Sequence, residues 1–209
     1  MSDDLAYLQR LHREPPALLL ELEQRGHADG VPILDRASAR LLSTLVHCMQ
    51  ANRILELGTA YGFSTLWMAQ AMPPAGKIWT IDPDIERTKL AVSFLERAGV
   101  SERVEIINQP ALEVLPAFQQ RNLDIVFIDA IKEEYEGYLH YAVPLLKLSG
   151  LVVVDNLLWH GRAGAAERPD DDAPTKAIRR FNHVFLNHPQ LDATIIPVGD
   201  GVGVAARID

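Results

Sequence analysis

The chain has 209 residues, of which 48% are apolar and 23% charged, and its formal net charge is −8. These values predict one globular domain over residues 1–209 and disfavour a broad nucleic-acid-binding surface. The single cysteine, Cys48, excludes an intramolecular disulfide and a thiolate metal cluster, and we expect it to lie in the core.

The first fifty residues predict helices over 3–12, over 16–26 and from about 36 onward, which would cap a site or pair two subunits. The first ten residues are acidic and lack the apolar core of a signal peptide. No stretch approaches the ~18 consecutive apolar residues of a membrane span. We therefore expect a cytoplasmic protein that does not associate with membranes.

From residue 53 onward, short apolar runs alternate with helical patterns, and the last two runs are joined by the turn sequence PVGDG. The predicted strands cover residues 53–57, 77–81, 103–107, 123–128, 151–154, 192–196 and 202–207, and the predicted helices cover 63–72, 84–98, 111–120, 132–146 and 173–187. This alternation predicts an α/β fold with a Rossmann-like, doubly wound sheet of five parallel strands and helices on both faces. The turn adds a carboxyl-terminal antiparallel hairpin, which gives seven strands in all.

The junction after the first strand, RILELGTAYGFS, combines an acid with a glycine turn. Glu56 lies at the carboxyl end of the strand, where open α/β sheets bind ligands, and Gly58 and Gly62 permit a close backbone approach. The spacing matches neither GxGxxG nor a P-loop, and an acid would repel a phosphate. A sulfonium cofactor, S-adenosylmethionine, fits better, and the alternative is a tight corner with only a structural role.

Acids also follow three later strands. Asp82 ends the second strand, where it would bind ribose hydroxyls or only cap the next helix in competition with Asp84. Asp129 follows the fourth strand, and Asp155 and Asn156 follow the fifth. Because neighbouring strands lie about 5 Å apart, these oxygens could meet around Mg²⁺, Mn²⁺ or Ca²⁺. The alternative for the last pair is a polar turn.

Lys132 comes three residues after Asp129 and could project over the same point. A nearby dication would favour its neutral form, so that it could accept a proton from a hydroxyl. The alternative is a solvated surface lysine.

Four motifs occur in this order: ILELGTAYGFSTLWMA, TIDPD, FIDAIKEEY and VVVDNLLWHGR. Together they resemble the metal-dependent class I S-adenosylmethionine O-methyltransferases, the caffeoyl-CoA and catechol O-methyltransferase group with its bacterial relatives, over residues 31–207. The resemblance implies a homodimer and assigns a role to each candidate. Cofactor contacts would come from Glu56, Gly58 and Ser64 (methionine part), Asp82 (ribose), the stretch around Ala111 (adenine) and Asp129; the metal ligands would be Asp129, Asp155 and Asn156; the catalytic pair would be Asp129 and Lys132.

Two positions depart from the family pattern: Gln109-Pro110 replaces a frequent glycine-aspartate pair, and Ile131 replaces a frequent polar residue. Trp159, His160 and Arg162 could line an acceptor pocket, or Trp159 could pack in the core. We expect methyl transfer to a hydroxyl of a catechol-like or hydroxycinnamoyl-type small molecule. The alternatives are methylation of a hydroxylated base in tRNA, a nicotinamide-dependent oxidoreductase and a cofactor-binding protein without catalysis.

Overall fold

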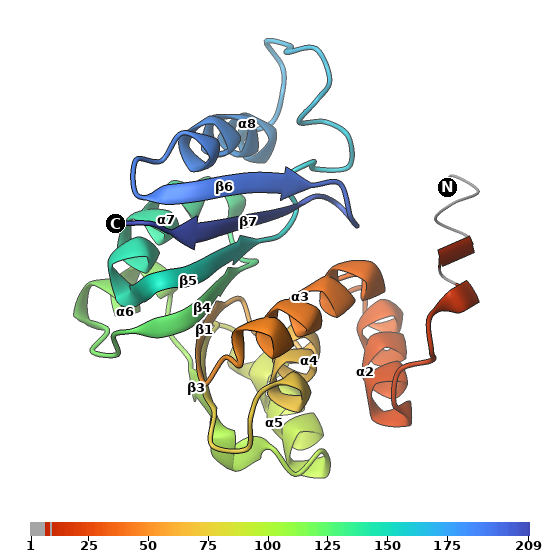
Figure 1. Cartoon of the computed structure of the whole chain (residues 1–209). Coiled ribbons are helices and arrows are strands. Elements are labelled where there is room, and N and C mark those ends of the chain that lie inside the picture. Colours follow the sequence, from red (N-terminus) through yellow and green to blue (C-terminus); the bar gives the residue numbers. More distant parts are fainter. Residues whose placement is uncertain (1–6, 9) are drawn as a thin grey trace.

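The computed structural model describes residues 7, 8 and 10–209 (Figure 1). The helix expected over 3–12 falls partly on residues 1–6 and 9, which lie outside the described residues. Residues 7, 8, 10 and 11 are helical. No described helix is both long and apolar enough to cross a membrane.

A seven-stranded sheet forms the centre of the molecule, in the order β3-β2-β1-β4-β5-β7-β6. The strands are β1 (Arg53–Leu57), β2 (Lys77–Ile81), β3 (Val104–Ile107), β4 (Leu123–Ile128), β5 (Leu146–Val154), β6 (Leu191–Ile196) and β7 (Val202–Arg207). The first five strands are parallel, whereas β7 pairs antiparallel with both β5 and β6. The predicted fold class, five parallel strands extended by a hairpin, is therefore confirmed.

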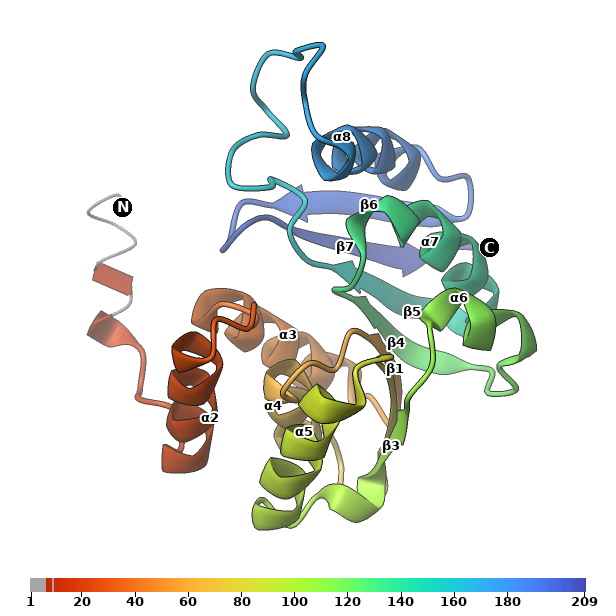
Figure 2. The same ribbon diagram turned by 180° about the vertical axis from the view of Figure 1, so that it is seen from behind.

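Helices cover both faces of the sheet, as Figures 1 and 2 show from opposite sides. One face carries α2 (Ala17–Ala28), α3 (Arg36–Met49), α4 (Phe63–Ala71) and α5 (Ile85–Arg97), and the other carries α6 (Ala111–Val114), α7 (Tyr135–Leu145) and α8 (Ala173–Leu186). The central strand β4 is buried along its whole length. Its side chains alternate between the two cores, with Val126 and Ile128 in one and Ile125 and Phe127 in the other.

Three sequence expectations differ from the structure. The helix expected over 111–120 is only α6 followed by the 3-10 turn Leu115–Ala117, because Pro116 lacks the N–H that an α-helix needs. β5 begins at Leu146, five residues earlier than expected. Cys48 is exposed rather than buried, because it lies about 200° around α3 from the buried Val46.

The segment between α2 and α3 lies over the carboxyl edge of the sheet. Asp35 caps α3 by accepting hydrogen bonds from the backbone N–H groups of Ala37 and Ser38. The turn between β6 and β7 reaches the same carboxylate, since a Cβ placed on Gly199 would lie 1.9 Å from Asp35 Oδ2. The amino-terminal segment and the carboxyl-terminal hairpin thus meet beside this edge.

Backbone hydrogen bonds fix the first residue after four of the five parallel strands at this edge. Asp155 donates its N–H to Ile128, Asp129 to Leu57, Gly58 to Ile81, and Asp82 to Ile107. Each bond extends the strand pairing by one position. The side chains that follow the strands are therefore held in register at one rim.

Candidate functional site

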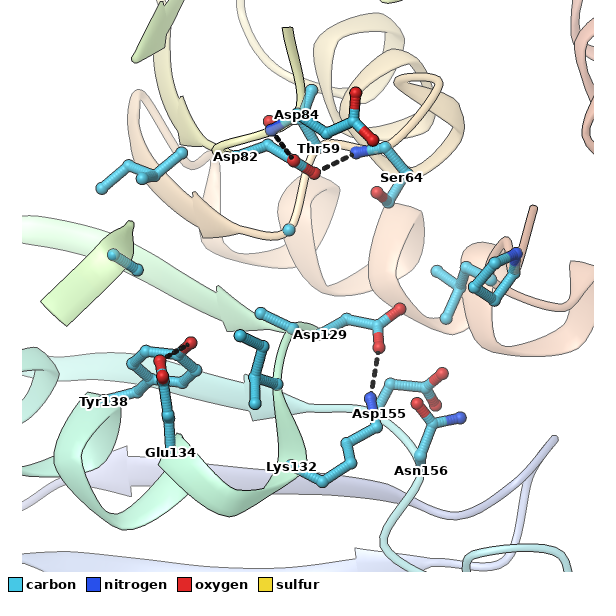
Figure 3. Close-up of a pocket in the computed structure, with 18 of the residues that line it drawn as sticks. Thr59, Ser64, Asp82, Asp84, Asp129, Lys132, Glu134, Tyr138, Asp155 and Asn156 are labelled. Carbon is cyan, nitrogen blue, oxygen red and sulfur yellow. Dashed lines mark hydrogen bonds and ion pairs between the residues drawn. The ribbon is translucent and has the colours of Figure 1, made fainter. Parts of the chain in front are cut away.

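A cavity of about 980 Å³ opens at this rim (Figure 3). Its walls come from the ends of β1, β2, β4 and β5, the segment Pro32, Ile33 and Leu34, and the start of α7. Among the expected site residues, the cavity is lined by Gly58, Ser64, Asp82, Ala111, Asp129, Lys132, Asp155 and Asn156. The structure therefore brings together eight of the nine residues expected to bind the cofactor, bind the metal or act in catalysis.

Gly58 is required by the shape of the cavity floor. Its φ is +100°, and a Cβ at this position would lie 2.0 Å from the carbonyl oxygen of Asp129. No L side chain fits such a close approach between the ends of β1 and β4.

Asp82 is held by the backbone rather than capping a helix. Its Oδ2 accepts from the N–H of Ala60 at 2.8 Å and its Oδ1 from the N–H of Asp84 at 2.9 Å. The cap of α5 is Asp84, which accepts from the N–H of Arg87. Asp82 thus keeps a fixed carboxylate at the cavity wall, and the capping alternative is wrong.

Glu56 is the expected residue that does not line the cavity. It is fully buried beneath the glycine turn, where its carboxylate accepts hydrogen bonds from Ser64 at 2.5 Å, Thr65 at 2.5 Å and Thr80 at 2.6 Å. Burial raises the pKa of Glu56 to about 7. The expectation of a direct cofactor contact is corrected here: Glu56 supports the turn from below.

Asp129, Asp155 and Asn156 point toward the same part of the cavity in Figure 3. Asp155 is buried and its Oδ1 has no hydrogen-bond partner. Burial, together with the nearby Asp129 carboxylate, raises the pKa of Asp155 to about 8. Asn156 has a φ of +64° and donates from Nδ2 to Asp200 Oδ2 at 3.4 Å, which leaves its amide oxygen for a ligand.

Lys132 lies in the 3-10 turn that leads into α7, and it is not a solvated surface lysine. Its side chain is 13% exposed, and Nζ lies 2.9 Å from Asp129 Oδ1 and 2.7 Å from Tyr135 Oη. Tyr135 is fully buried, and burial raises the pKa of its phenol well above the ordinary value. A lysine, two carboxylates and an amide are therefore gathered at one end of the cavity.

A model of the O-methyltransferase family matches residues 16–208. The chain belongs to this O-methyltransferase family. The resemblance carried by the four motifs is thereby confirmed, as is the predicted enzyme class, a methyltransferase that uses S-adenosylmethionine.

This O-methyltransferase has relatives in several bacteria. It is 40% identical over 184 residues to catechol O-methyltransferase from Mycobacterium tuberculosis, a match that covers 88% of this chain and 82% of the relative. It is 32% identical to catechol O-methyltransferase from Niastella koreensis, with 94% and 87% covered. Among solved structures, an O-methyltransferase from Streptomyces achromogenes in complex with SAM superposes with a TM-score of 0.86 at 30% identity, covering 98% of this chain and 95% of that one.

The oxygen donors of this O-methyltransferase fit a hard divalent cation. The unpartnered, buried Asp155 Oδ1 needs a cation or a donor, and carboxylate and amide oxygens suit Mg²⁺, Mn²⁺ or Ca²⁺. Within the described part of the chain, no site gathers three His, Cys, Asp or Glu side chains for a metal. A cation here would therefore use two carboxylates and the Asn156 amide, with further positions left for water or substrate.

Other cavity residues escaped the sequence analysis or received no definite role there. Ile33, Glu134 and Tyr138 line the cavity, and Asp200 orients Asn156 from the β6–β7 turn. Glu134 lies within the motif FIDAIKEEY but received no role there, whereas Asp200 is remote in sequence from Asn156 and no local motif signals its position.

Trp159 and His160 line the cavity as expected, whereas Arg162 does not. The Arg162 guanidinium instead lies 5.2 Å from the centroid of the Trp159 ring. The Trp159 indole N–H also donates to Thr175 Oγ1 at 3.1 Å. Trp159 therefore both packs against its neighbours and faces the cavity.

Proposed function

We propose that this enzyme transfers the methyl group of S-adenosylmethionine to one hydroxyl of a catechol-like or hydroxycinnamoyl-type small molecule, with a divalent cation at Asp129, Asp155 and Asn156. The single observation that carries the proposal is the gathering of these three residues with Lys132 in one cavity. Two of the relatives described above are catechol O-methyltransferases, which supports a catechol-like acceptor.

The cavity residues divide the work between cofactor and acceptor. Asp82 would accept hydrogen bonds from ribose hydroxyls, and Gly58 would let the cofactor lie against the backbone. A bound cation would lower the pKa of an acceptor hydroxyl and orient it. Trp159 would provide an aromatic wall for the acceptor ring, and positioning of the two substrates would supply much of the rate.

Lys132 would accept the proton that the acceptor hydroxyl loses. In the structure its amine is paired with Asp129. A cation bound to the same carboxylate would compete with the Lys132 amine for it, which would release the amine from this pair to act as a base. The same cation would therefore prepare both the acceptor and the base.

Methyl-transfer assays test this proposal. The purified chain is incubated with methyl-labelled S-adenosylmethionine and one of three acceptors, a simple catechol, a hydroxycinnamoyl thioester or tRNA, with Mg²⁺, with Mn²⁺ or with excess chelator. We expect transfer to a small-molecule acceptor that chelator abolishes. Transfer to tRNA alone would contradict the small-molecule acceptor.

The variant Asp129→Asn tests the metal assignment. Because it removes one anionic ligand, we expect transfer to fall at least ~100-fold at limiting Mg²⁺, with partial recovery at high Mg²⁺. Near-normal methyl transfer by this variant in the presence of chelator would contradict the metal-dependent mechanism. Glu102→Gln, which removes an exposed carboxylate that does not line the cavity, controls for the loss of a charge.

A further inference from the structure

The buried hydroxyl of Tyr135 lies between Lys132, the proposed base, and the main chain of Asp155, a proposed metal ligand. Tyr135 is the first residue of α7 and is 0% exposed. Its Oη accepts a hydrogen bond from Lys132 Nζ at 2.7 Å and donates one to the main-chain carbonyl of Asp155 at 3.2 Å. The reaction proposed above does not use this group.

Two oxygens hold the amine of Lys132. Lys132 Nζ donates hydrogen bonds to Asp129 Oδ1 and to Tyr135 Oη, and the phenol donates onward to the carbonyl of Asp155. Lys132 lines the cavity, so these bonds restrict where its amine lies at that end of the cavity.

Tyr135 is held rigidly enough for this task. Its ring packs edge-to-face against the fully buried Phe181 of α8, with centroids 5.3 Å apart, and its hydroxyl is bound to a backbone carbonyl. Asp129 is the less constant neighbour, because a cation would share its carboxylate. Tyr135 is neutral and has no such second role.

We propose that Tyr135 is a positioning residue that fixes the Lys132 amine where it can accept the proton of the acceptor hydroxyl. The inference rests on the proposed function. As the oxygen–carbon bond forms, the carbon–sulfur bond breaks and its electron pair stays on sulfur. The proton of the hydroxyl passes to Lys132 Nζ.

The test compares Tyr135→Phe with Tyr141→Phe, using catechol and the more acidic 4-nitrocatechol as acceptors at saturating Mg²⁺. Tyr141 lies on the same helix and does not border the cavity. We expect Tyr135→Phe to lower kcat ~10-fold with catechol but less than ~2-fold with 4-nitrocatechol, which needs less help in losing its proton. The acceptor KM and the calorimetric Kd for S-adenosylhomocysteine should stay within ~2-fold, and Tyr141→Phe should match the native chain.

The ratio of the two kcat values within one preparation does not depend on how much of the variant is folded. Equal losses with both acceptors, or no loss with catechol, would overturn the positioning role and leave the proposed function standing. A native chain that binds S-adenosylhomocysteine but methylates neither catechol would overturn both.

Discussion

Gly58 is the residue at which the glycine turn and the end of β4 come closest. Its positive φ and the carbonyl of Asp129 leave no room for a side chain. Glu56 lies just below, where three hydroxyl groups satisfy its carboxylate. The motif ELG therefore combines a backbone that lines the cavity with an acid that faces the core.

Gly58→Ala should damage both stability and cofactor binding. The added methyl group requires the turn to move away from Asp129, at a cost on the order of 2–4 kcal/mol. Urea unfolding and calorimetry with S-adenosylhomocysteine measure the two effects. Gly164→Ala is the matched control, because a Cβ there meets no atom within 4 Å; equal behaviour of the two variants would contradict the close approach.

Glu56→Gln should change how stability depends on pH. The pKa of Glu56 is about 7 in the folded chain, above its ordinary value of 4.5, so its contribution to stability is full below pH 4.5 and is lost as pH rises through 7. Relative to Glu56→Gln, the native chain should lose on the order of 3 kcal/mol of unfolding free energy between pH 4.5 and 7.5.

Urea titrations of both chains across this range measure the difference. Glu102→Gln, at an exposed position, should run parallel to the native chain. A constant gap between the native chain and Glu56→Gln would show that Glu56 does not titrate in this window.

At the scale of elements, the hairpin of β6 and β7 supports the loop that begins with Asp155 and Asn156. Asp200 in its turn accepts from the N–H of Leu158 through its carbonyl at 2.8 Å and from the N–H of His160 through Oδ1 at 2.5 Å. Its Oδ2 faces the Asn156 amide. The hairpin at the edge of the sheet therefore also holds two residues of the cavity wall, Asn156 and His160, in place.

Asp200→Ala should weaken the proposed cation site without touching the cofactor. A freed Asn156 would raise the Mg²⁺ concentration for half-maximal activity by ~10-fold or more, since outer supports of metal ligands have effects of that size. The Kd for S-adenosylhomocysteine should not change. Asp192→Ala, on the exposed side of β6, is the control, and an unaltered Mg²⁺ requirement in Asp200→Ala would exclude this support.

Sequence patterns predicted the elements wherever the pattern was local. The strands β1, β2, β4 and β7 were predicted with their observed bounds, and in the first three the apolar run stops at a glycine or an acid. The start of β5 was missed because Ser149 and Gly150 interrupt its apolar pattern, and Ser149 has a φ of +61°. Only its pairing with β4, where the register shifts near Leu123, makes this part a strand.

Across the whole molecule, strand order determines how much of the site is predictable. Acids after parallel strands must lie at one rim, so Asp82, Asp129 and Asp155 could be assigned to the cavity from sequence alone. The buried position of Glu56 could not be predicted in this way. It depends on the contact between its carboxylate and Thr80 of the neighbouring strand β2. Asp200 is equally remote in sequence from the loop that it supports.

The homodimer stays a prediction at this scale. If the chain forms a homodimer, light scattering at micromolar concentration should give a particle with twice the mass of one chain. A particle of single-chain mass that transfers methyl groups at full rate would refute it, and would leave the helices before β1 with the capping role alone.

The contact between Gly199 and Asp35 joins residues from opposite halves of the polypeptide. A chain that is still being synthesised lacks this contact until its last hairpin has been made. The rim of the cavity beside Asp35 is therefore complete only when both ends of the polypeptide are present.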